Sequence, residues 1–220
     1  MADMRRLDAG RVRENAVRVR EEIAAAAHRA GRDPADVELL TAVKYVAVED
    51  IGVLAEAGLT LFGENRAQEL EAKVAAWPDP ALRWHFIGRL QSRKVRRILP
   101  LVELTHSVAS DSALAQLERH GTPATEVLVE VNVAGEDAKA GIAPEALDDF
   151  LARVPVRVAG LMGMPPFADD PEASRPHFAR LRELAAEHRL RHLSIGTSQD
   201  YAVAVEEGAT IVRIGSILFD

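Results

Sequence analysis

A lysine stands directly after the first strongly apolar segment of the chain. Residues 37–43 are mostly apolar, and Lys44 follows them at once. A lysine amine that has lost its proton attacks carbonyl carbons to form an imine, and removal from water favours that neutral form. The alternative is a surface lysine whose carbon stem packs on the protein while its ammonium stays in water. Lys44 is therefore a candidate for imine chemistry.

Two small-residue turns near the end of the sequence could bind an anion. The first follows the β-prone residues 192–195, and the second follows residues 210–214. Backbone N–H groups at such turns bind phosphate, although glycine and serine also simply form tight turns. The candidate contacts are Ser198, which could also cap a helix, Arg213, Gly215 and Ser216. An amine and a phosphate cradle at one site would suit a phosphorylated aldehyde.

Short β-prone segments alternate with helical ones along most of the chain. The candidate strands are residues 37–43, 59–62, 84–87, 101–106, 126–131, 156–161, 192–195 and 210–214. Apolar strands that alternate with helices predict a parallel sheet covered by helices. Eight repeats favour a closed (β/α)8 TIM barrel, and a doubly wound open sheet is the alternative. In a closed barrel the first strand neighbours the last, so we expect Lys44 and the two turns at one rim.

An additional helix precedes the first strand. Val12, Ala16, Val19 and Ile23 recur at spacings of three and four, which predicts a helix that ends at Gly31. The candidate helices between the strands are residues 48–57, 67–76, 92–99, 112–119, 144–153, 173–188 and 200–207. No linker interrupts this pattern, so we expect one α/β domain over residues 1–220.

Composition excludes several kinds of function. The chain has no cysteine, which removes disulfides, thiol catalysis and cysteine-bound zinc and fits a reducing compartment. A net charge of -7 disfavours nucleic acid and anionic membranes, so the basic residues 89–97 are interpreted as a solvated helix face. No apolar run approaches the roughly 20 residues of a membrane span, and residues 1–32 do not read as a secretory signal. We expect a cytoplasmic protein. His85 and His106 end two strands and are interpreted as rim residues.

A set of motifs in this order identifies a resemblance. They are residues 42–44 (Ala-Val-Lys), 62–70 (Phe-Gly-Glu-Asn-Arg-Ala-Gln-Glu-Leu), 84–94 (Trp-His-Phe-Ile-Gly-Arg-Leu-Gln-Ser-Arg-Lys), 131–133 (Val-Asn-Val), 139–142 (Lys-Ala-Gly-Ile), 160–162 (Gly-Leu-Met), 194–198 (Ser-Ile-Gly-Thr-Ser) and 212–215 (Val-Arg-Ile-Gly). Over nearly its whole length the chain resembles the pyridoxal phosphate homeostasis protein family, alanine-racemase-like proteins of the YggS type.

The resemblance implies a monomeric barrel that binds pyridoxal 5′-phosphate (PLP) as a Schiff base on Lys44. It implies a role in holding and supplying the cofactor, with apo PLP-dependent enzymes as transient partners, and no robust turnover. Asn65 and Asn132 are expected near the cofactor ring, and loop capping is their alternative role. The chain departs from the family pattern at Tyr45, Thr197, Gln199 and Asp220. Tyr45 is the departure most able to alter cofactor binding, because it adjoins the lysine.

Two other functions fit parts of the pattern. A PLP-dependent amino-acid racemase of the alanine racemase type needs an acid and a base on opposite faces of the cofactor adduct, and Lys44 supplies only one of them. The sequence contains only two tyrosines, Tyr45 and Tyr201, as further candidates. An aldolase would use Lys44 on a phosphorylated sugar without any cofactor. Visible colour separates the aldolase from the two PLP-binding hypotheses, since only a PLP imine absorbs visible light.

Overall fold

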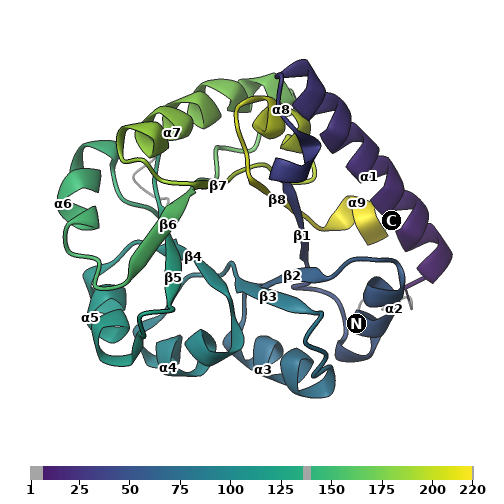
Figure 1. Ribbon diagram of the computed structural model, residues 1–220, viewed down its shortest axis with the longest axis horizontal. Helices are drawn as coiled ribbons and strands as arrows, with labels where there is room; N and C mark the ends of the chain where they lie inside the picture. The colour runs from purple at the N-terminus through teal and green to yellow at the C-terminus, as the bar shows by residue number, and fades with distance from the viewer. Residues whose placement is uncertain (1–6, 136–139, 220) are drawn as a thin grey trace.

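Parallel strands form a closed barrel in this computed structural model, which describes residues 7–135 and 140–219 (Figure 1). The strands are β1 (Glu38–Ala42), β2 (Leu61–Glu64), β3 (Arg83–Phe86), β4 (Leu104–Val108), β5 (Glu126–Glu130), β6 (Arg157–Met162), β7 (His192–Ser194) and β8 (Ile211–Ile214). Each strand pairs with the next along the chain, and β8 closes the barrel by pairing with β1. The predicted (β/α)8 barrel is confirmed, and the open-sheet alternative is excluded.

Helices surround the barrel on its outside (Figure 1). The helices are α1 (Ala9–Arg29), α2 (Ile51–Glu56), α3 (Ala67–Ala76), α4 (Val95–Ile98), α5 (Asp111–His120), α6 (Leu147–Leu151), α7 (Arg175–Glu187), α8 (Tyr201–Glu206) and α9 (Ser216–Phe219). The predicted N-terminal helix is α1, which packs against α8 and α9. It begins after Asp8, whose side chain caps it by accepting from Arg11 N at 2.7 Å. Within the described ranges, no helix has the length and apolar character that crossing a membrane requires.

Strand alternation divides the core into two parts. Successive strand residues point to opposite faces, so every second side chain enters the barrel. An apolar layer fills the barrel interior and comprises Leu40, Leu61, Leu104, Leu128, Ala159, Met162 and Ile211. The larger core lies between strands and helices and includes the buried face of α1. Two residues beyond several members of the apolar layer, toward the carboxyl ends of the strands, the interior becomes polar.

One predicted strand begins too early. Residues 101–106 were expected to be extended, but the strand is Leu104–Val108, and Leu99–Leu101 form a 3-10 turn that continues α4. Pro100 explains the difference, because its fixed φ suits the first turn of a helix and it cannot donate to a neighbouring strand. The short helix α9 was not predicted, since four residues are too few to show helical periodicity.

Candidate functional site

Lys44 follows β1 at the carboxyl end of the barrel, and its side chain is exposed. Its Nζ lies 4.7 Å from the ring centroid of Tyr45, which is 77% exposed. The flanking residues Val43 and Val46 are buried and hold the loop. The loop is anchored by its apolar neighbours, and the exposed amine, the arrangement that the surface-lysine alternative describes, is accessible to a carbonyl compound.

The turns after β7 and β8 lie together and against β1. Gly215 N donates to Ser198 Oγ at 3.3 Å, and Arg213 N donates to the carbonyl of Gly196 at 3.0 Å. Gly196 has a φ of +87°, which glycine adopts without strain. A Cβ on Gly215 would lie 3.4 Å from the carbonyl oxygen of Ala42, two residues before Lys44. The structure thus places the phosphate-turn candidates beside the strand that leads to the lysine.

Asp200 organises the turn after β7. The residue is buried, and its carboxylate accepts from Thr197 N at 2.7 Å, Thr197 Oγ1 at 3.1 Å and Ser174 Oγ at 2.9 Å. Helix α8 begins directly after it, so the predicted N-cap role of Ser198 is wrong. The Ser198 hydroxyl faces Gly215 instead, while Ser216 is exposed as the first residue of α9.

Arg213 is a buried cation inside the barrel. Its guanidinium donates to Ser194 O and Ser194 Oγ, both at 2.6 Å, and to the carbonyl of Gly163 at 3.1 Å. All three acceptors are uncharged, and no carboxylate of a described residue forms an ion pair with it. Burial lowers the pKa of Arg213 to about 10, which keeps it protonated at neutral pH. The arginine is predicted as a contact of an anion at the second turn, and its hydrogen bonds place the guanidinium in the barrel interior.

His85 and His106 are also inside the barrel, so their interpretation as rim residues is wrong. His85 Nδ1 lies 3.0 Å from His106 Nε2, and His106 Nδ1 lies 2.9 Å from Ser194 Oγ. Burial lowers the pKa of His85 to about 3 and that of His106 well below its usual value. Strand alternation was the missed signal, because His106 stands two residues after the inward-facing Leu104. Nowhere in the described ranges do three potential metal ligands cluster.

A buried ion pair braces the lysine loop from outside the barrel wall. Lys73 Nζ on α3 donates to Glu64 Oε2 at 2.5 Å and to the carbonyl of Val43 at 2.7 Å. The other oxygen, Glu64 Oε1, accepts from Asn65 N at 2.6 Å and Arg66 N at 3.0 Å. Both charged side chains are 0% exposed. The pair thus ties the residue before Lys44 to the loop after β2. We did not predict it, although Lys73 lies three residues after the buried Leu70.

Asn65 and Asn132 stand at the ends of β2 and β5, as predicted. Asn65 Oδ1 is buried and has no hydrogen-bond partner in the described part of the chain. Asn132 is half-buried, and its backbone N donates to the carbonyl of Ile142 at 2.9 Å. Lys139, from the motif at residues 139–142, and Asp220, one of the departures from the family pattern, lie outside the described residues. An unpaired buried amide oxygen costs free energy unless a ligand or water meets it, which makes Asn65 a binding candidate.

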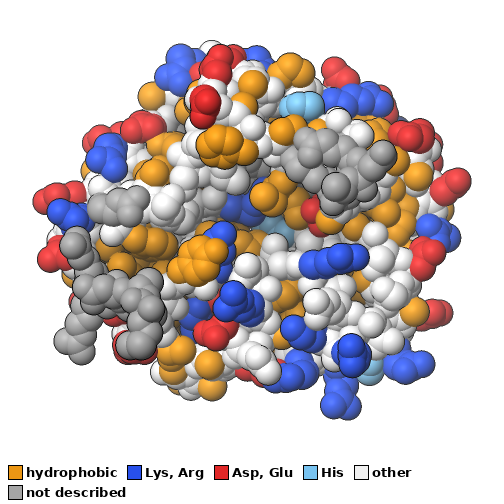
Figure 2. Space-filling view, turned by 180° about the vertical axis from the view of Figure 1, so that it is seen from behind, with side chains coloured by type: hydrophobic (Ala, Val, Ile, Leu, Met, Phe, Trp, Pro, Cys, Tyr) orange, Lys and Arg blue, Asp and Glu red, His pale blue; other side chains and the backbone are white. Residues whose placement is uncertain are grey.

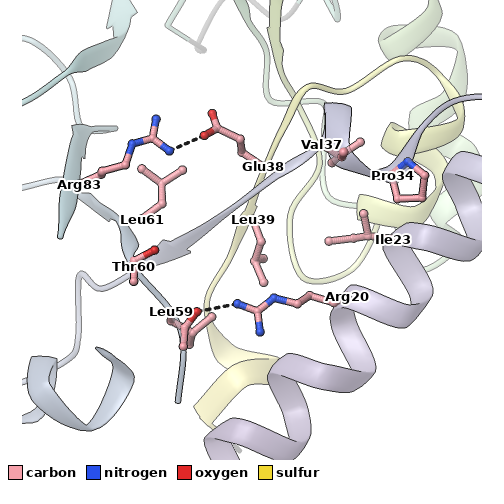
Figure 3. A pocket seen from close by; sticks show the side chains of 12 residues that line it. Arg20, Ile23, Pro34, Val37, Glu38, Leu39, Leu59, Thr60, Leu61 and Arg83 are labelled. Atoms are coloured by element: carbon pink, nitrogen blue, oxygen red, sulfur yellow. Dashed lines mark hydrogen bonds and ion pairs between the residues drawn. The ribbon is translucent and has the colours of Figure 1, made fainter. Parts of the chain in front are cut away.

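The two ends of the barrel differ in charge. Figure 2 faces the carboxyl end, where Lys and Arg side chains gather around the middle and most acidic side chains lie at the periphery. At the amino end, a cavity of about 420 Å³ is lined by Arg20, Glu38 and Arg83 among others (Figure 3). Its polar groups already have partners, because Arg83 pairs with Glu38 at 2.5 Å and Arg20 donates to the carbonyl of Gly58 at 2.7 Å. The candidate site is therefore the carboxyl end.

Known proteins share the sequence pattern and the fold of this chain. Residues 11–220 match the sequence family described as alanine racemase, N-terminal domain. A pyridoxal phosphate homeostasis protein of Aquifex aeolicus is 43% identical over 219 residues, covering 94% of this chain and 96% of that protein. A crystal structure of an unknown protein from Bifidobacterium adolescentis superposes with a TM-score of 0.87 at 31% identity, covering 96% and 95% of the two chains.

A second solved structure was determined with a cofactor. PipY of Synechococcus elongatus with PLP bound has a TM-score of 0.76 and 32% identity, and the match covers 92% of this chain and 100% of PipY. The match of the family and the similarity to these relatives both extend over almost the full length. The chain therefore belongs to the alanine racemase N-terminal domain family and, within it, to the pyridoxal phosphate homeostasis proteins.

Proposed function

We propose that this chain binds PLP as an imine on Lys44 and holds and supplies the cofactor. One observation carries the proposal: an accessible primary amine lies on the loop after β1, and the paired turns after β7 and β8 pack directly against that strand. Pyridoxal phosphate carries an aldehyde and a phosphate, which suit an amine and a cradle of small residues. The names of the relatives and the PLP-bound PipY structure support the same ligand.

The residues at the site fit this cofactor. A Cβ on Gly215 would already be in van der Waals contact with Ala42, at 3.4 Å from its carbonyl oxygen and 3.6 Å from its Cβ, so this turn lies close against β1. We assign the phosphate to Ser198, Gly215 and Ser216, and the ring to Asn65, Asn132 and Arg213. The unpaired Asn65 Oδ1 and the Arg213 guanidinium, which has no carboxylate of a described residue in direct contact, are groups that a polar ring can satisfy. When bound, PLP supplies an electron-withdrawing ring, whereas the chain supplies the amine, the anchoring contacts and the fixed charge.

The tyrosines favour binding over turnover. The Tyr201 hydroxyl donates to Glu22 of α1, so it is engaged at the contact between α1 and α8, and burial raises its pKa. Tyr45 is next to Lys44 but points its ring at solvent. Neither is held where an acid opposite Lys44 would be needed for racemisation. Steady racemisation of alanine by the purified protein, lost in Lys44→Ala, would instead favour the racemase.

The test of the proposal is covalent trapping. The purified protein loaded with PLP should absorb visible light, and borohydride reduction should leave a pyridoxyl adduct that mass spectrometry locates on Lys44. Lys44→Ala should lose the visible band and the adduct, and because Lys44 is exposed its unfolding free energy should change by less than about 0.5 kcal/mol. Lys94→Ala is the matched control and should keep both. An adduct on another lysine, or an unchanged band in Lys44→Ala, would refute the imine.

The proposal extends to the setting of the protein. We propose a cytoplasmic monomer that passes PLP transiently to apo PLP-dependent enzymes. The lack of cysteine fits a reducing compartment. Sedimentation equilibrium gives the oligomeric state, and cell fractionation gives the location. Mixing the loaded protein with an apo transaminase should restore transaminase activity faster than the same concentration of PLP-treated Lys44→Ala or buffer alone.

A further inference from the structure

We propose that His85, His106 and Ser194 form a directionally ordered hydrogen-bond relay inside the barrel that positions Arg213, with Glu103 as its anionic end. The relay itself is a property of the protein without ligand. Its consequence for the cofactor rests on the proposed function, because that function assigns Arg213 to the PLP ring. In this role the histidines and the serine are positioning residues that act through the arginine.

The hydrogen bonds run without a gap from His85 to Arg213, and Glu103 lies beyond hydrogen-bond distance at the outer end. Glu103 Oε2 lies 3.8 Å from His85 Nε2, His85 Nδ1 lies 3.0 Å from His106 Nε2, and His106 Nδ1 lies 2.9 Å from Ser194 Oγ. Ser194 Oγ accepts from Arg213 NH1 at 2.6 Å. Side chains of β3, β4, β7 and β8 thus meet across the interior above the apolar layer. All of them are buried except Glu103, whose side chain is 52% exposed.

Hydrogen-bond chemistry fixes the direction of the relay. A guanidinium can only donate, so Arg213 uses a lone pair of Ser194 Oγ and leaves the serine proton free to donate to His106 Nδ1. A neutral His106 then carries its proton on Nε2 and donates to His85 Nδ1. His85 in turn carries its proton on Nε2, toward the Glu103 carboxylate. Since burial lowers both histidine pKa values, each ring is neutral and carries one proton.

The opposite direction is less favourable at both ends. It would leave the Ser194 proton without an acceptor in this cluster, because Arg213 and His106 would both be donors to the same oxygen. It would also turn the lone pair of His85 Nε2 toward the Glu103 carboxylate, which repels it. Because Ser194 is fully buried, leaving its proton without an acceptor costs free energy, and the repulsion between His85 Nε2 and Glu103 adds to that cost, so one tautomer order is selected.

The relay holds the arginine without cancelling its charge. A carboxylate in direct contact would fix the guanidinium but would also neutralise it. Ser194 and Gly163 offer only neutral oxygens, and the acid of the relay lies three side chains away. Asp200 and Glu130 act on Arg213 electrostatically without hydrogen bonding to it, and burial raises the pKa of Glu130. The positive charge therefore remains available to an electron-rich or anionic group.

The outer end of the relay is braced at the opposite face. Glu103 Oε2 also accepts from Arg83 Nε at 2.8 Å, and Arg83 lines the cavity at the amino end (Figure 3). Arg83 also donates to Glu38 of β1 through NH1. The carboxylate of Glu103, which ends the relay, is therefore held by an arginine that is itself paired with a second carboxylate. The relay thus connects the partnered groups of the amino end with the arginine near the carboxyl end.

The tautomers give a test in the protein without PLP. Nitrogen-15 NMR of labelled histidine at pH 7 should show both His85 and His106 protonated on Nε2 and unprotonated on Nδ1. Ser194→Ala should shift the His106 Nδ1 and Arg213 side-chain signals. Thr105→Val should not, because Thr105 is the buried neighbour of His106 with an unpartnered hydroxyl outside the relay. A proton on Nδ1 of either ring, or unchanged signals in Ser194→Ala, would overturn the relay.

Cofactor loading tests the positioning role. Ser194→Ala should weaken PLP retention about tenfold, the equivalent of one charge-assisted hydrogen bond, and shift the visible absorption maximum. Ser194→Thr keeps a hydroxyl and should restore the maximum, and Thr105→Val should match the wild type. Equal retention and identical spectra in Ser194→Ala and the wild type would overturn the positioning role. If the wild type binds no PLP, the proposed function fails while the tautomer result still decides the relay.

Discussion

The barrel buries two cations in opposite ways. Lys73 lies outside the strands and pairs with Glu64, with both side chains 0% exposed. Arg213 lies inside the strands, is 7% exposed, and donates only to uncharged oxygens. A charge that pairs directly with an opposite charge contributes to the architecture, whereas a buried charge with no carboxylate in contact leaves an electrostatic potential that a ligand can use. Lys73 therefore belongs to the scaffold that supports the site, and Arg213 to the part of the site that is available to a ligand.

Each cation also organises a different part of the mouth. Lys73 connects the carbonyl of Val43 to Glu64, and so fixes the loop that carries Lys44. Arg213 connects β7 to β8 through Ser194, beneath the turns assigned to the phosphate. The position of the Lys44 amine therefore depends on the Lys73–Glu64 ion pair. The part of the site assigned to the cofactor ring depends on the positive charge of Arg213.

The largest expected effect comes from breaking the compensated pair. Lys73→Met removes the ammonium and leaves the Glu64 carboxylate buried without a counterion, which should lower the free energy of unfolding by about 3–5 kcal/mol. Urea unfolding followed by circular dichroism measures it. The variant should also lose imine formation at Lys44, because Val43 loses its hydrogen bond.

A double variant distinguishes stability from position. Lys73→Met combined with Glu64→Gln removes both charges and should recover most of the lost stability. The glutamine oxygen can still accept from Asn65 N, but nothing replaces the donor to Val43. PLP trapping at Lys44 should therefore stay weaker than in the wild type. Full recovery of trapping would show that the ion pair only stabilises the fold.

The next effect is acid sensitivity from the relay beside Arg213. The pKa of His85 is about 3 in the fold against a usual 6.5, because burial disfavours the charged ring. Below pH 6.5 His85 is protonated in the unfolded chain but stays neutral in the folded chain. The free energy of unfolding is therefore highest above pH 6.5 and decreases as the pH falls toward 3. The slope is about 1.4 kcal/mol per pH unit for this residue, or roughly 3 kcal/mol at pH 4.5 to 4.

Urea unfolding at several pH values tests this slope. The double variant His85→Gln, His106→Gln should show a shallower loss of stability between pH 6.5 and 4 than the wild type. His28→Gln changes an exposed histidine on α1 and serves as the control, with the wild-type slope expected. Identical slopes in the wild type and the double variant would mean that the pKa values of the two histidines in the folded protein are not lowered.

Local patterns predicted the barrel and the backbone positions of the site. The alternation of strands and helices gave all eight strands, because each repeat carries its own signal within a few residues. Lys44, Asn65 and the two turns follow strand ends, which a closed barrel brings to one rim. The helix at residues 67–76 agrees with α3 at both ends.

The partners of buried polar groups could not be predicted in the same way. His85 and His106 lie 21 residues apart, and His106 and Ser194 lie 88 apart, so no spacing indicates their contact. Whether Lys44 is exposed depends on the rotamer and on Tyr45, which the strand pattern does not specify. Long-range register and side-chain orientation decide these features, and both are properties of the closed barrel.

The smallest of these effects is expected from Arg213→Met, and it tests the comparison most directly. The substitution removes three hydrogen bonds but breaks no direct ion pair among the described residues, because Asp200 and Glu130 act on Arg213 without contacting it, and it relieves the desolvation of the guanidinium. The free energy of unfolding should fall by only about 1–2 kcal/mol, less than in Lys73→Met. PLP retention should nevertheless fall strongly, because the positive charge at the mouth is gone. A loss of stability equal to that of Lys73→Met would mean that a counter-charge such as Glu130 already compensates Arg213, and the two cations would then have the same role.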